Sequence, residues 1–533
     1  MGAVQSALRN VYLSINTALG AIAEMNADFN LLLARINANP GLPVSNPTSP
    51  FWLSNPPFPA LTKIQSKKLP TSADIVIIGS GITGTSIAMT ILEESKAMGI
   101  ETKVVMLEAR EITSGATGRN GGHIKTAPYE LFYQMKEKLG VDQAKKIVQY
   151  QMILLDLLPK LAKEKGWHKA EAREVETVDL FFDDKMFEKA RQWADELRIH
   201  MPEYYNDMRF WDAKEAQEKF QTGSHLVGAL TYTAGAIWPF RFVTSCLSYL
   251  LESFTSAFSI ETGTPVTSIT MSEDPSKTYS IHTPRGDINT KHVIHATEAH
   301  TANLIPKLRG KLFAVRGHMS AQRPGKLFPQ LNGDRSWSFI HAKGYEYITQ
   351  RPGDVDADSD GLGAEIMTGG GLRLGGNGMD EVGVAVDNRT RLDISSYLGG
   401  VLPTVFGSQN WGEDAARGRM KGDVWTGTMG FSADGFPFVG KLDPSLTGRK
   451  ANKSYDPASG AEWISAGYGG EGMPQAWLCG CACALMVLGR DKVDLDERSG
   501  RPGGKLMDWF PEQMIITPER VSRANINELA SEL

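Results

Sequence analysis

Three glycines between residues 79 and 84 have the spacing of a turn that binds the phosphates of a dinucleotide. They belong to the run Gly79-Ser80-Gly81-Ile82-Thr83-Gly84. In such a run the first glycine permits a tight turn, the second lets a pyrophosphate approach the backbone, and the third lets the next helix pack closely. The free amides and the positive dipole end of that helix would face the phosphates, so the run predicts an anion site.

The elements around this turn support the interpretation. Residues 75–78 are an uninterrupted β-branched run, which is typical of a parallel strand buried on both faces. A helix is expected from Thr85 to about Met98, and a second apolar strand over residues 104–107 ends at Glu108. The carboxylate of Glu108 would accept hydrogen bonds from the adenosine ribose and would repel the 2′-phosphate of NADP. The sequence therefore predicts a βαβ unit for a dinucleotide.

The loop after Glu108 indicates which dinucleotide this is. Residues 110–125 read REITSGATGRNGGHIK, which is rich in Gly, Ser and Thr and has four basic or imidazole side chains. Such a loop has little apolar surface to bury and suits the lining of a long cofactor. The glycine run, Glu108 and residues 114–122 resemble the FAD-dependent amine and amino-acid oxidases of the D-amino-acid oxidase superfamily, especially the branch of γ-glutamylputrescine oxidase and monomeric sarcosine oxidase.

The resemblance implies FAD as the cofactor. The segment before Asp434 has Gly427 and no cysteine, so the FAD is expected to be non-covalent. In the first cofactor segment the implied FAD-binding residues are Gly79, Gly81, Ile82, Thr83, Gly84, Glu108, Ala109, Arg110, Ser114, Thr117, Gly118, Arg119, Asn120, Gly121, Gly122 and His123. In later segments they are Val266, Ala296, Thr297, Trp425, Gly435, Gly467, Tyr468, Gly469, Gly470, Glu471, Gly472 and Met473. No metal site is predicted.

Four side chains are candidates for the catalytic side of the flavin: Arg373, His318, Tyr347 and Glu471. A Gly-Leu-x-Leu-Gly segment of monomeric sarcosine oxidase resembles residues 371–375 and carries a lysine that promotes reaction with oxygen. Arg373 occupies that position. A fixed positive charge there would stabilise reduced flavin or superoxide, but arginine and lysine are not interchangeable, and a structural role for Arg373 stays open. Glu471 stands where relatives have histidine and would either orient a cationic amine or face solvent.

The resemblance implies a two-domain α/β fold. A Rossmann-like FAD-binding domain is expected from residues 71–127, 235–319 and 420–490. An interleaved substrate domain containing an antiparallel sheet is expected from residues 128–234 and 320–419. Residues 1–70 are predicted to form an N-terminal amphipathic helix and a proline-rich arm, and residues 491–533 a C-terminal tail.

Apolar residues recur at alternating spacings of four and three between residues 4 and 36, which predicts a long amphipathic helix that ends near Asn39. Three uses of this helix are open: packing on its own subunit, forming a homo-oligomer through residues 4–36, or membrane or import use. The sequence Met1-Gly2 with Ser6 also fits a myristoylation pattern.

Length and composition narrow the classes of protein. A chain of 533 residues is long enough for two domains, and a net charge of −5 gives no electrostatic case for nucleic acid as a partner. No run of 18 apolar residues is present, so no transmembrane helix is expected. The four cysteines are interpreted as buried reduced thiols, which suits a reducing compartment, and a cytoplasmic location is expected.

The predicted reaction is oxidation of a carbon–nitrogen bond of a small amine or amino acid to an imine, with oxygen as the expected acceptor. Two alternatives stay open at this point. One is a flavin dehydrogenase or a tailoring oxidoreductase with another acceptor or a larger substrate. The other is a non-catalytic flavoprotein assembled through its N-terminal helix.

Overall fold

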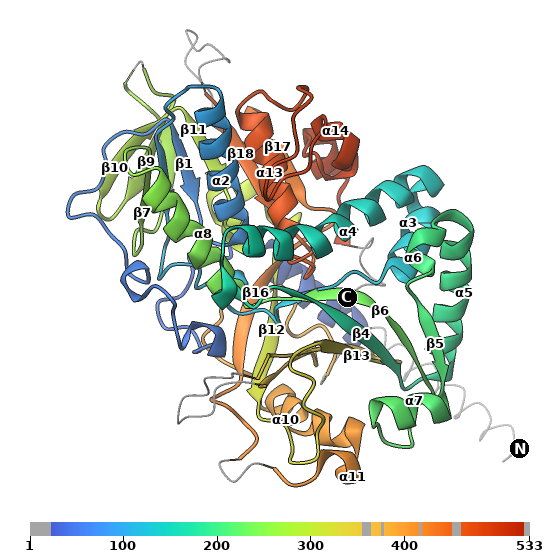
Figure 1. Cartoon of the computed structure of the whole chain (residues 1–533). Coiled ribbons are helices and arrows are strands. Elements are labelled where there is room, and N and C mark those ends of the chain that lie inside the picture. The colour runs from blue at the N-terminus through green and yellow to red at the C-terminus, as the bar shows by residue number, and fades with distance from the viewer. Residues whose placement is uncertain are drawn as a thin grey trace, which may run out of the picture.

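A six-stranded, mostly parallel sheet, called the first sheet below, lies in the upper part of the molecule in Figure 1. The computed structural model describes residues 23–274, 276–353, 364–374, 378–414, 418–449 and 460–526. The strand order is β17-β18-β11-β1-β2-β7, and only β17 runs antiparallel to its neighbour. The strands are β1 (Ile75–Ile78), β2 (Val104–Leu107), β7 (Phe258–Glu261), β11 (His292–His295), β17 (Phe438–Lys441) and β18 (Glu462–Ala466).

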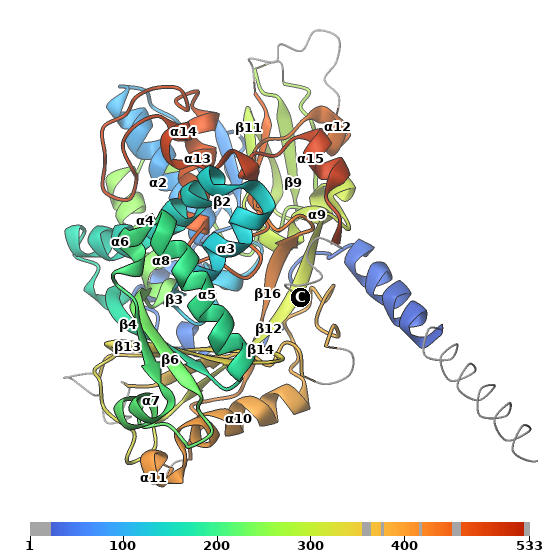
Figure 2. The same cartoon turned by 90° about the vertical axis from the view of Figure 1, so that its right-hand side faces the viewer.

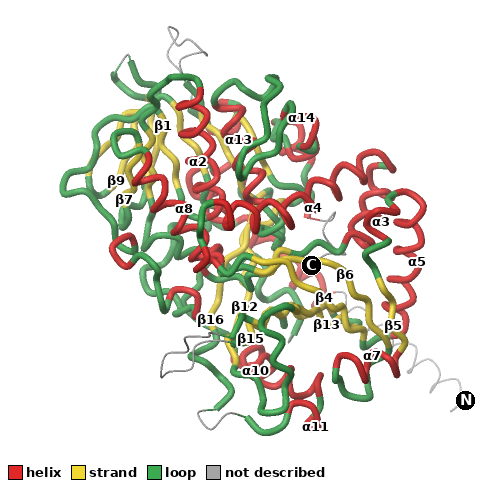
Figure 3. The backbone as a smooth tube through the Cα atoms, in the orientation of Figure 1, coloured by secondary structure: helices red, strands yellow, loops and turns green. Residues whose placement is uncertain are grey.

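The two faces of this sheet have different coverings. Ile75 and Ile77 of β1 pack with the helices α2 (Ile82–Ala97), α8 (Pro239–Ser253) and α13 (Ala476–Val487), which lie along one side of the sheet in Figure 3. Val76 and Ile78 pack toward a small antiparallel sheet on the other side. Its strands are β8 (Ser268–Met271), β9 (Tyr279–Thr283) and β10 (Gly286–Thr290). Because both faces are covered, a wholly apolar strand is favoured in β1, as its sequence predicts.

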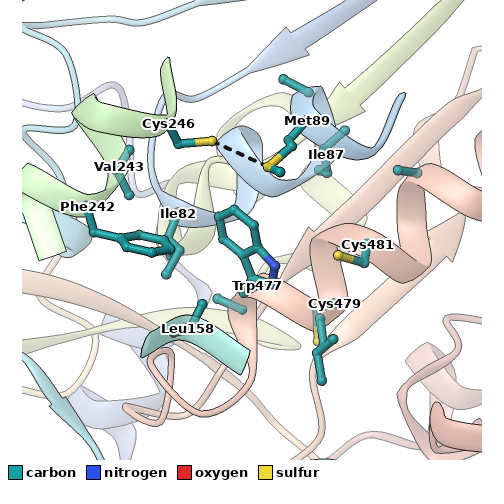
Figure 4. Packing of buried hydrophobic residues seen from close by; sticks show 14 of the residues in the cluster. Ile82, Ile87, Met89, Leu158, Phe242, Val243, Cys246, Trp477, Cys479 and Cys481 are labelled. Carbon is teal, nitrogen blue, oxygen red and sulfur yellow. Dashed lines mark hydrogen bonds between the residues drawn. The ribbon is translucent and has the colours of Figure 1, made fainter. Parts of the chain in front are cut away.

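The helices α2, α8 and α13 share an apolar core (Figure 4). Met89 of α2, Cys246 of α8 and Trp477 of α13 are all buried in it. All four cysteines are free and buried, so the predicted reduced thiols are confirmed. Burial raises the pKa of the Cys479 thiol to about 12, which keeps it protonated and unreactive at neutral pH.

A second sheet of nine strands forms the other part of the molecule. The order is β16-β12-β15-β14-β13-β4-β6-β3, and β5 pairs with β6 beside it. The strands are β3 (His123–Ile124), β4 (Arg173–Phe181), β5 (Arg209–Asp212), β6 (Gly228–Ala236), β12 (Leu312–Gln322), β13 (Arg335–His341), β14 (Gly344–Gln350), β15 (Ile366–Gly369) and β16 (Trp425–Ser432). The expected antiparallel pairing holds throughout except between β4 and β13, which run parallel. These two strands come from separate chain segments, so no hairpin turn joins them.

Helices cover the second sheet unequally. Val178, Trp337 and Ile348 point to one face, where they pack with α10 (Leu392–Phe406). The helices α3 (Pro128–Leu139), α4 (Val141–Glu164) and α5 (Asp184–His200) pack near β6. The remaining helices are α6 (Pro202–Tyr205), α7 (Ala213–Phe220), α9 (Thr301–Leu304), α11 (Ser408–Trp411), α12 (Pro444–Thr447), α14 (Leu506–Trp509) and α15 (Pro518–Arg523). The predicted domain boundary at residues 319 and 320 falls inside β12.

The described part of the chain begins with a helix over residues 23–37, which projects from the body of the protein in Figure 2. Its end agrees with the predicted end near Asn39, whereas residues 1–22 lie outside the described part. In the described part of the chain, no helix is both long and apolar enough to cross a membrane.

The proline-rich arm after this helix is part of the core. Trp52 is only 1% exposed, and its ring packs against Phe51 and Trp238. The indole N–H of Trp52 donates to the carbonyl of Asn120, and the indole of Trp238 donates to the carbonyl of Trp52 at 2.9 Å. The arm therefore supports the loop that is predicted to hold the cofactor.

We expect Trp52→Ala to lower the free energy of unfolding by about 3–5 kcal/mol, because it removes a buried indole and leaves a cavity. Trp52→Phe keeps an aromatic ring but loses the hydrogen bond to Asn120, so its loss should be smaller. Chemical denaturation of both variants measures this. An unchanged stability of Trp52→Ala would mean that the arm is only loosely attached.

Candidate functional site

The glycine turn is in close contact with neighbouring backbone atoms. These contacts are possible only because Gly79 and Gly84 have no side chain. Gly79 has φ +111°, and a Cβ atom there would lie 2.3 Å from the carbonyl oxygen of Ala296. A Cβ atom on Gly84 would lie 2.1 Å from the carbonyl oxygen of Gly79. The first contact brings the end of β11 onto the turn, and the second brings α2 onto it. The first and third glycines of the motif therefore have the roles predicted for them.

Glu108 is held at the end of β2, where it faces the glycine turn. Its Oε2 accepts from the backbone N–H of Ser80 at 3.2 Å and from the Ser80 hydroxyl at 2.6 Å. Its Oε1 accepts from the backbone N–H of Arg110 at 2.9 Å. The hydroxyl oxygen of Ser80 also accepts from the N–H of Thr113 at 2.8 Å, which ties the following loop to the turn. A fixed carboxylate at this strand end suits the ribose of a dinucleotide.

The loop of residues 114–122 packs tightly against its neighbours. The Thr117 hydroxyl accepts from the N–H of Ile82 at 3.0 Å, at the start of α2. A Cβ atom on Gly118 would lie 2.5 Å from the carbonyl oxygen of Thr113 and 2.7 Å from Leu53 of the arm. A Cβ atom on Gly121 would lie 2.6 Å from the ring of Tyr347. The glycines of this loop thus let it lie between the first sheet, the arm and the second sheet.

Arg110 and Arg119 share one buried acid, Asp387. Arg110 donates from both terminal nitrogens to the Asp387 carboxylate at 3.0 Å, and Arg119 Nε lies 3.3 Å from the same group. Arg119 also donates to the carbonyl of Thr426 at 2.8 Å, and burial lowers its pKa to about 10. Their role toward FAD stays a prediction. Asp387 lies far along the chain in no recognisable motif, so the sequence offered no signal for it.

The later cofactor segments meet the first one. Tyr468 places its hydroxyl 2.9 Å from the hydroxyls of Thr83 and Ser465, which links the segment after β18 to the first turn of α2. Gly467, Gly469 and Gly470 all have positive φ. Ala296 lies against Gly79, as described above. The structure therefore brings together the predicted residues of three distant segments.

Three other predicted cofactor residues, Trp425, Val266 and Gly435, come from separate segments of the chain. Trp425 is buried and donates from its indole to the carbonyl of Arg119 at 2.9 Å. Val266 is buried in the core that also contains Ile78 and Leu107. Gly435 lies in the turn after β16, next to Asp434, which pairs with Arg520 of α15.

One row of the second sheet faces the cofactor loop. Across the sheet, Trp425 pairs with Met319, Met319 with Gly369, Gly369 with Tyr347, and Tyr347 with Ser338. Side chains directly opposite each other on neighbouring strands point to the same face. The ring of Tyr347 lies so close to Gly121 that a Cβ atom there would be 2.6 Å away. This face of the sheet therefore lies over the cofactor loop.

A buried charged cluster continues this row, and of its members only Lys125 belongs to a segment singled out from the sequence. The Lys125 ammonium pairs with Asp179 and donates to the Ser338 hydroxyl at 2.6 Å. The other oxygen of Asp179 accepts from the hydroxyls of Tyr129 and Tyr232, both at 2.8 Å. Burial lowers the pKa of Lys125, and the Asp179 carboxylate acts against this shift. An acid inside the apolar run of residues 178–181 was the signal that could have indicated Asp179.

His318 is not brought together with the other catalytic candidates. Successive residues on a strand point to opposite faces, and Met319 of β12 faces the cofactor loop. His318 is buried on the other face, where its Nε2 accepts from the N–H of Arg391 at 3.1 Å. Burial lowers its pKa to about 4, so it is neutral at physiological pH.

Of the other three candidates, Tyr347 and Arg373 lie near Tyr345, which is 61% exposed. A Cβ atom on Gly344, next to Tyr345 in β14, would lie 3.9 Å from the side chain of Arg373. The Glu471 Oε2 accepts from the side-chain amides of Gln151 at 3.3 Å and Gln475 at 3.2 Å. Two tyrosines and a guanidinium therefore lie together near the start of β14, while Glu471 is held beside the start of α13.

Comparison with known proteins identifies the family. Residues 74–485 match the family model described as FAD dependent oxidoreductase. The chain belongs to this family. The resemblance seen in the sequence is thereby confirmed at the level of the family, and FAD is its cofactor.

Individual relatives are distant. A probable oxidoreductase, OrdL, of Haemophilus influenzae is 22% identical over 276 residues, which cover 50% of this chain and 58% of the relative. Glycine oxidase from Geobacillus kaustophilus has a TM-score of 0.57 and 16% identity, covering 79% of this chain and 96% of its own. L-Proline dehydrogenase from P. horikoshii has a TM-score of 0.57 and 18% identity, covering 86% and 100%. At these identities the structural similarity establishes the fold.

The residues present fit FAD. The turn has no room for a side chain at Gly79 or Gly84, and Glu108 is fixed where the ribose of a dinucleotide binds in this motif. The buried hydroxyl of Ser114, in the predicted cofactor loop, has no hydrogen-bond partner among the described residues. A bound phosphate or ribose would satisfy such a group.

We expect Gly118→Ala to weaken FAD binding by at least about tenfold, because the added Cβ atom would displace the loop from Thr113 and Leu53. Gly399→Ala is the control, since nothing lies within 4 Å of a Cβ atom there and α10 is outside the cofactor loop. Titration of the apoproteins with FAD, followed by flavin fluorescence, measures both affinities. Equal affinities would show that the tight packing of Gly118 does not matter for the cofactor.

Proposed function

We propose that this protein oxidises the carbon–nitrogen bond of an amine or amino acid to an imine, which water then hydrolyses. Bound FAD supplies the acceptor for the hydride equivalent that leaves the carbon next to nitrogen. Family membership supports the redox class, and the structural similarity to enzymes named glycine oxidase and L-proline dehydrogenase supports the substrate class.

The observation that carries this proposal is the contact between Tyr347 and Gly121. It places one face of the second sheet against the cofactor loop, so a substrate held on this face lies beside the cofactor. Tyr345 and Tyr347 provide aromatic surface for the carbon skeleton. Glu471, held by two amides, would orient a cationic amine, and Arg373 supplies a fixed positive charge.

The electron acceptor has two candidates. Oxygen is the first, as in the oxidases that the sequence resembles. An acceptor other than oxygen is the second, because Arg373 stands where monomeric sarcosine oxidase has its lysine and because one similar structure is a dehydrogenase.

Anaerobic reduction of the flavin tests the reaction. We expect the visible flavin band to bleach when one group among secondary amines, polyamine derivatives and amino acids is added, and to recover in air with formation of peroxide. Bleaching with slow recovery in air would favour the dehydrogenase. A flavin that none of these compounds reduces would contradict the proposed substrate class.

We also propose that the N-terminal helix joins two copies of the chain. In the described part of its apolar stripe, Leu32 and Ile36 are buried against the body, whereas Met25 is 70% exposed and Phe29 is 44% exposed. These two residues continue the heptad spacing, and the helix that carries them projects from the body (Figure 2). A second copy of the same helix would cover them.

Introducing charge into the exposed stripe tests this assembly. We expect the double variant Met25→Glu, Phe29→Glu to shift the protein to a smaller species in light scattering, while each monomer keeps its stability within about 0.5 kcal/mol. The control is Ala27→Glu, Ala34→Glu, which adds the same charge at exposed positions outside the stripe. An unchanged mass of the stripe variant would contradict this role for the helix.

A further inference from the structure

Glu298 lies where three segments of the cofactor region meet. It follows Ala296 and Thr297 at the end of β11. Its Oε1 accepts from the N–H of Gly430 in β16 at 3.0 Å and from that of Tyr468 at 3.3 Å. Its Oε2 accepts from the N–H of Gly467 at 2.9 Å. A single carboxylate therefore joins β11, β16 and the segment after β18.

The backbone of Glu298 is in a conformation that glutamate rarely adopts. Its φ is +48°, in the left-handed region that favours glycine. Such a conformation persists where the surroundings fix it. The three hydrogen bonds of its side chain are the interactions that do so here.

The neighbouring backbone is shaped to receive this side chain. A Cβ atom on Gly430 would lie 2.9 Å from the Glu298 carboxylate, so only glycine admits the carboxylate at this point of β16. Gly467 has φ +88°, which turns its N–H toward the carboxylate. Burial raises the pKa of Glu298 to about 7, while the three amide donors act in the opposite direction.

The contact extends to the glycine turn through Tyr468. Glu298 holds the backbone of Tyr468, and the Tyr468 hydroxyl bonds to Thr83 of α2. The N–H of Gly469 donates to the carbonyl of Gly430 at 2.9 Å, so the same segment also lies along β16. Residues 467–470 are thus held by the carboxylate of the half-buried Glu298 together with these two hydrogen bonds.

We propose that Glu298 is a positioning residue for FAD. It fixes residues 467–470 against β16 and α2, and so sets the cofactor site on that side. When ionised, its half-buried carboxylate also makes electron uptake by a nearby flavin less favourable. Glu298 needs no contact with the substrate for either effect.

The test compares Glu298→Gly with Glu298→Gln. Glycine relieves the backbone conformation but removes the contact, whereas glutamine keeps the size and loses the charge. Gln221→Gly is the matched control, because Gln221 has φ +52° and is exposed at the end of α7, away from these segments. The readouts are the Kd of the apoprotein for FAD, the midpoint potential of the bound flavin and the Tm.

We expect Glu298→Gly to raise the Kd for FAD by about tenfold or more, because three buried amides lose their acceptor, and Glu298→Gln to raise it less, because its side chain keeps one acceptor oxygen. We expect the flavin midpoint potential to move to a more positive value in both. Gln221→Gly should keep the wild-type Kd and potential.

Wild-type Kd and potential in Glu298→Gly, together with a higher Tm, would overturn the proposal and leave Glu298 as a turn residue only. If Glu298→Gly does not fold, Glu298→Gln decides by the same two readouts. None of these measurements uses an amine, so failure here is distinct from failure of the proposed reaction.

Discussion

The close approach of three backbone segments at the glycine turn is the constraint on which the cofactor region depends. The carbonyl of Ala296 lies where a side chain of Gly79 would be, and the carbonyl of Gly79 lies where a side chain of Gly84 would be. Only because these side chains are missing can β11, β1 and α2 meet at one point. The hydrogen bonds of Glu108 and Tyr468 then fix the loops that surround this point.

Several other segments pack against the loop of residues 114–122, which lies next to the glycine turn. The arm supplies Trp52 and Leu53. Two strands of the second sheet supply the other contacts: β16 the carbonyl of Thr426, and β14 the ring of Tyr347. The loop of residues 114–122 contacts all three. The cofactor loop is therefore held from outside the first sheet, and the arm, which precedes the residues that match the family, is an integral part of this support.

The sequence allowed prediction of features whose signals are local. The βαβ unit, the glycine roles and the buried thiols follow from short patterns, and the structure agrees with them. Asp387 and Glu298 could not be predicted as connecting residues, because their partners lie far away in the chain. Asp179 had a local signal, but its partners are also distant in the chain. His318 shows a second limit: neighbouring residues on a strand point to opposite faces, and its motif does not say which face meets the cofactor. The apolar stripe likewise gave no indication that Leu32 would be buried and Met25 exposed.

The strand orders also carry a consequence for synthesis on the ribosome. In the first sheet β11 pairs with β18, residues 462–466, which is synthesised much later. In the second sheet β4 likewise pairs with the later strand β13, and β12 with the later strand β16. Neither sheet is complete until most of the chain has emerged. Such non-local pairing slows folding and leaves strand edges exposed during translation, so nascent chains of this protein are expected to depend on chaperones.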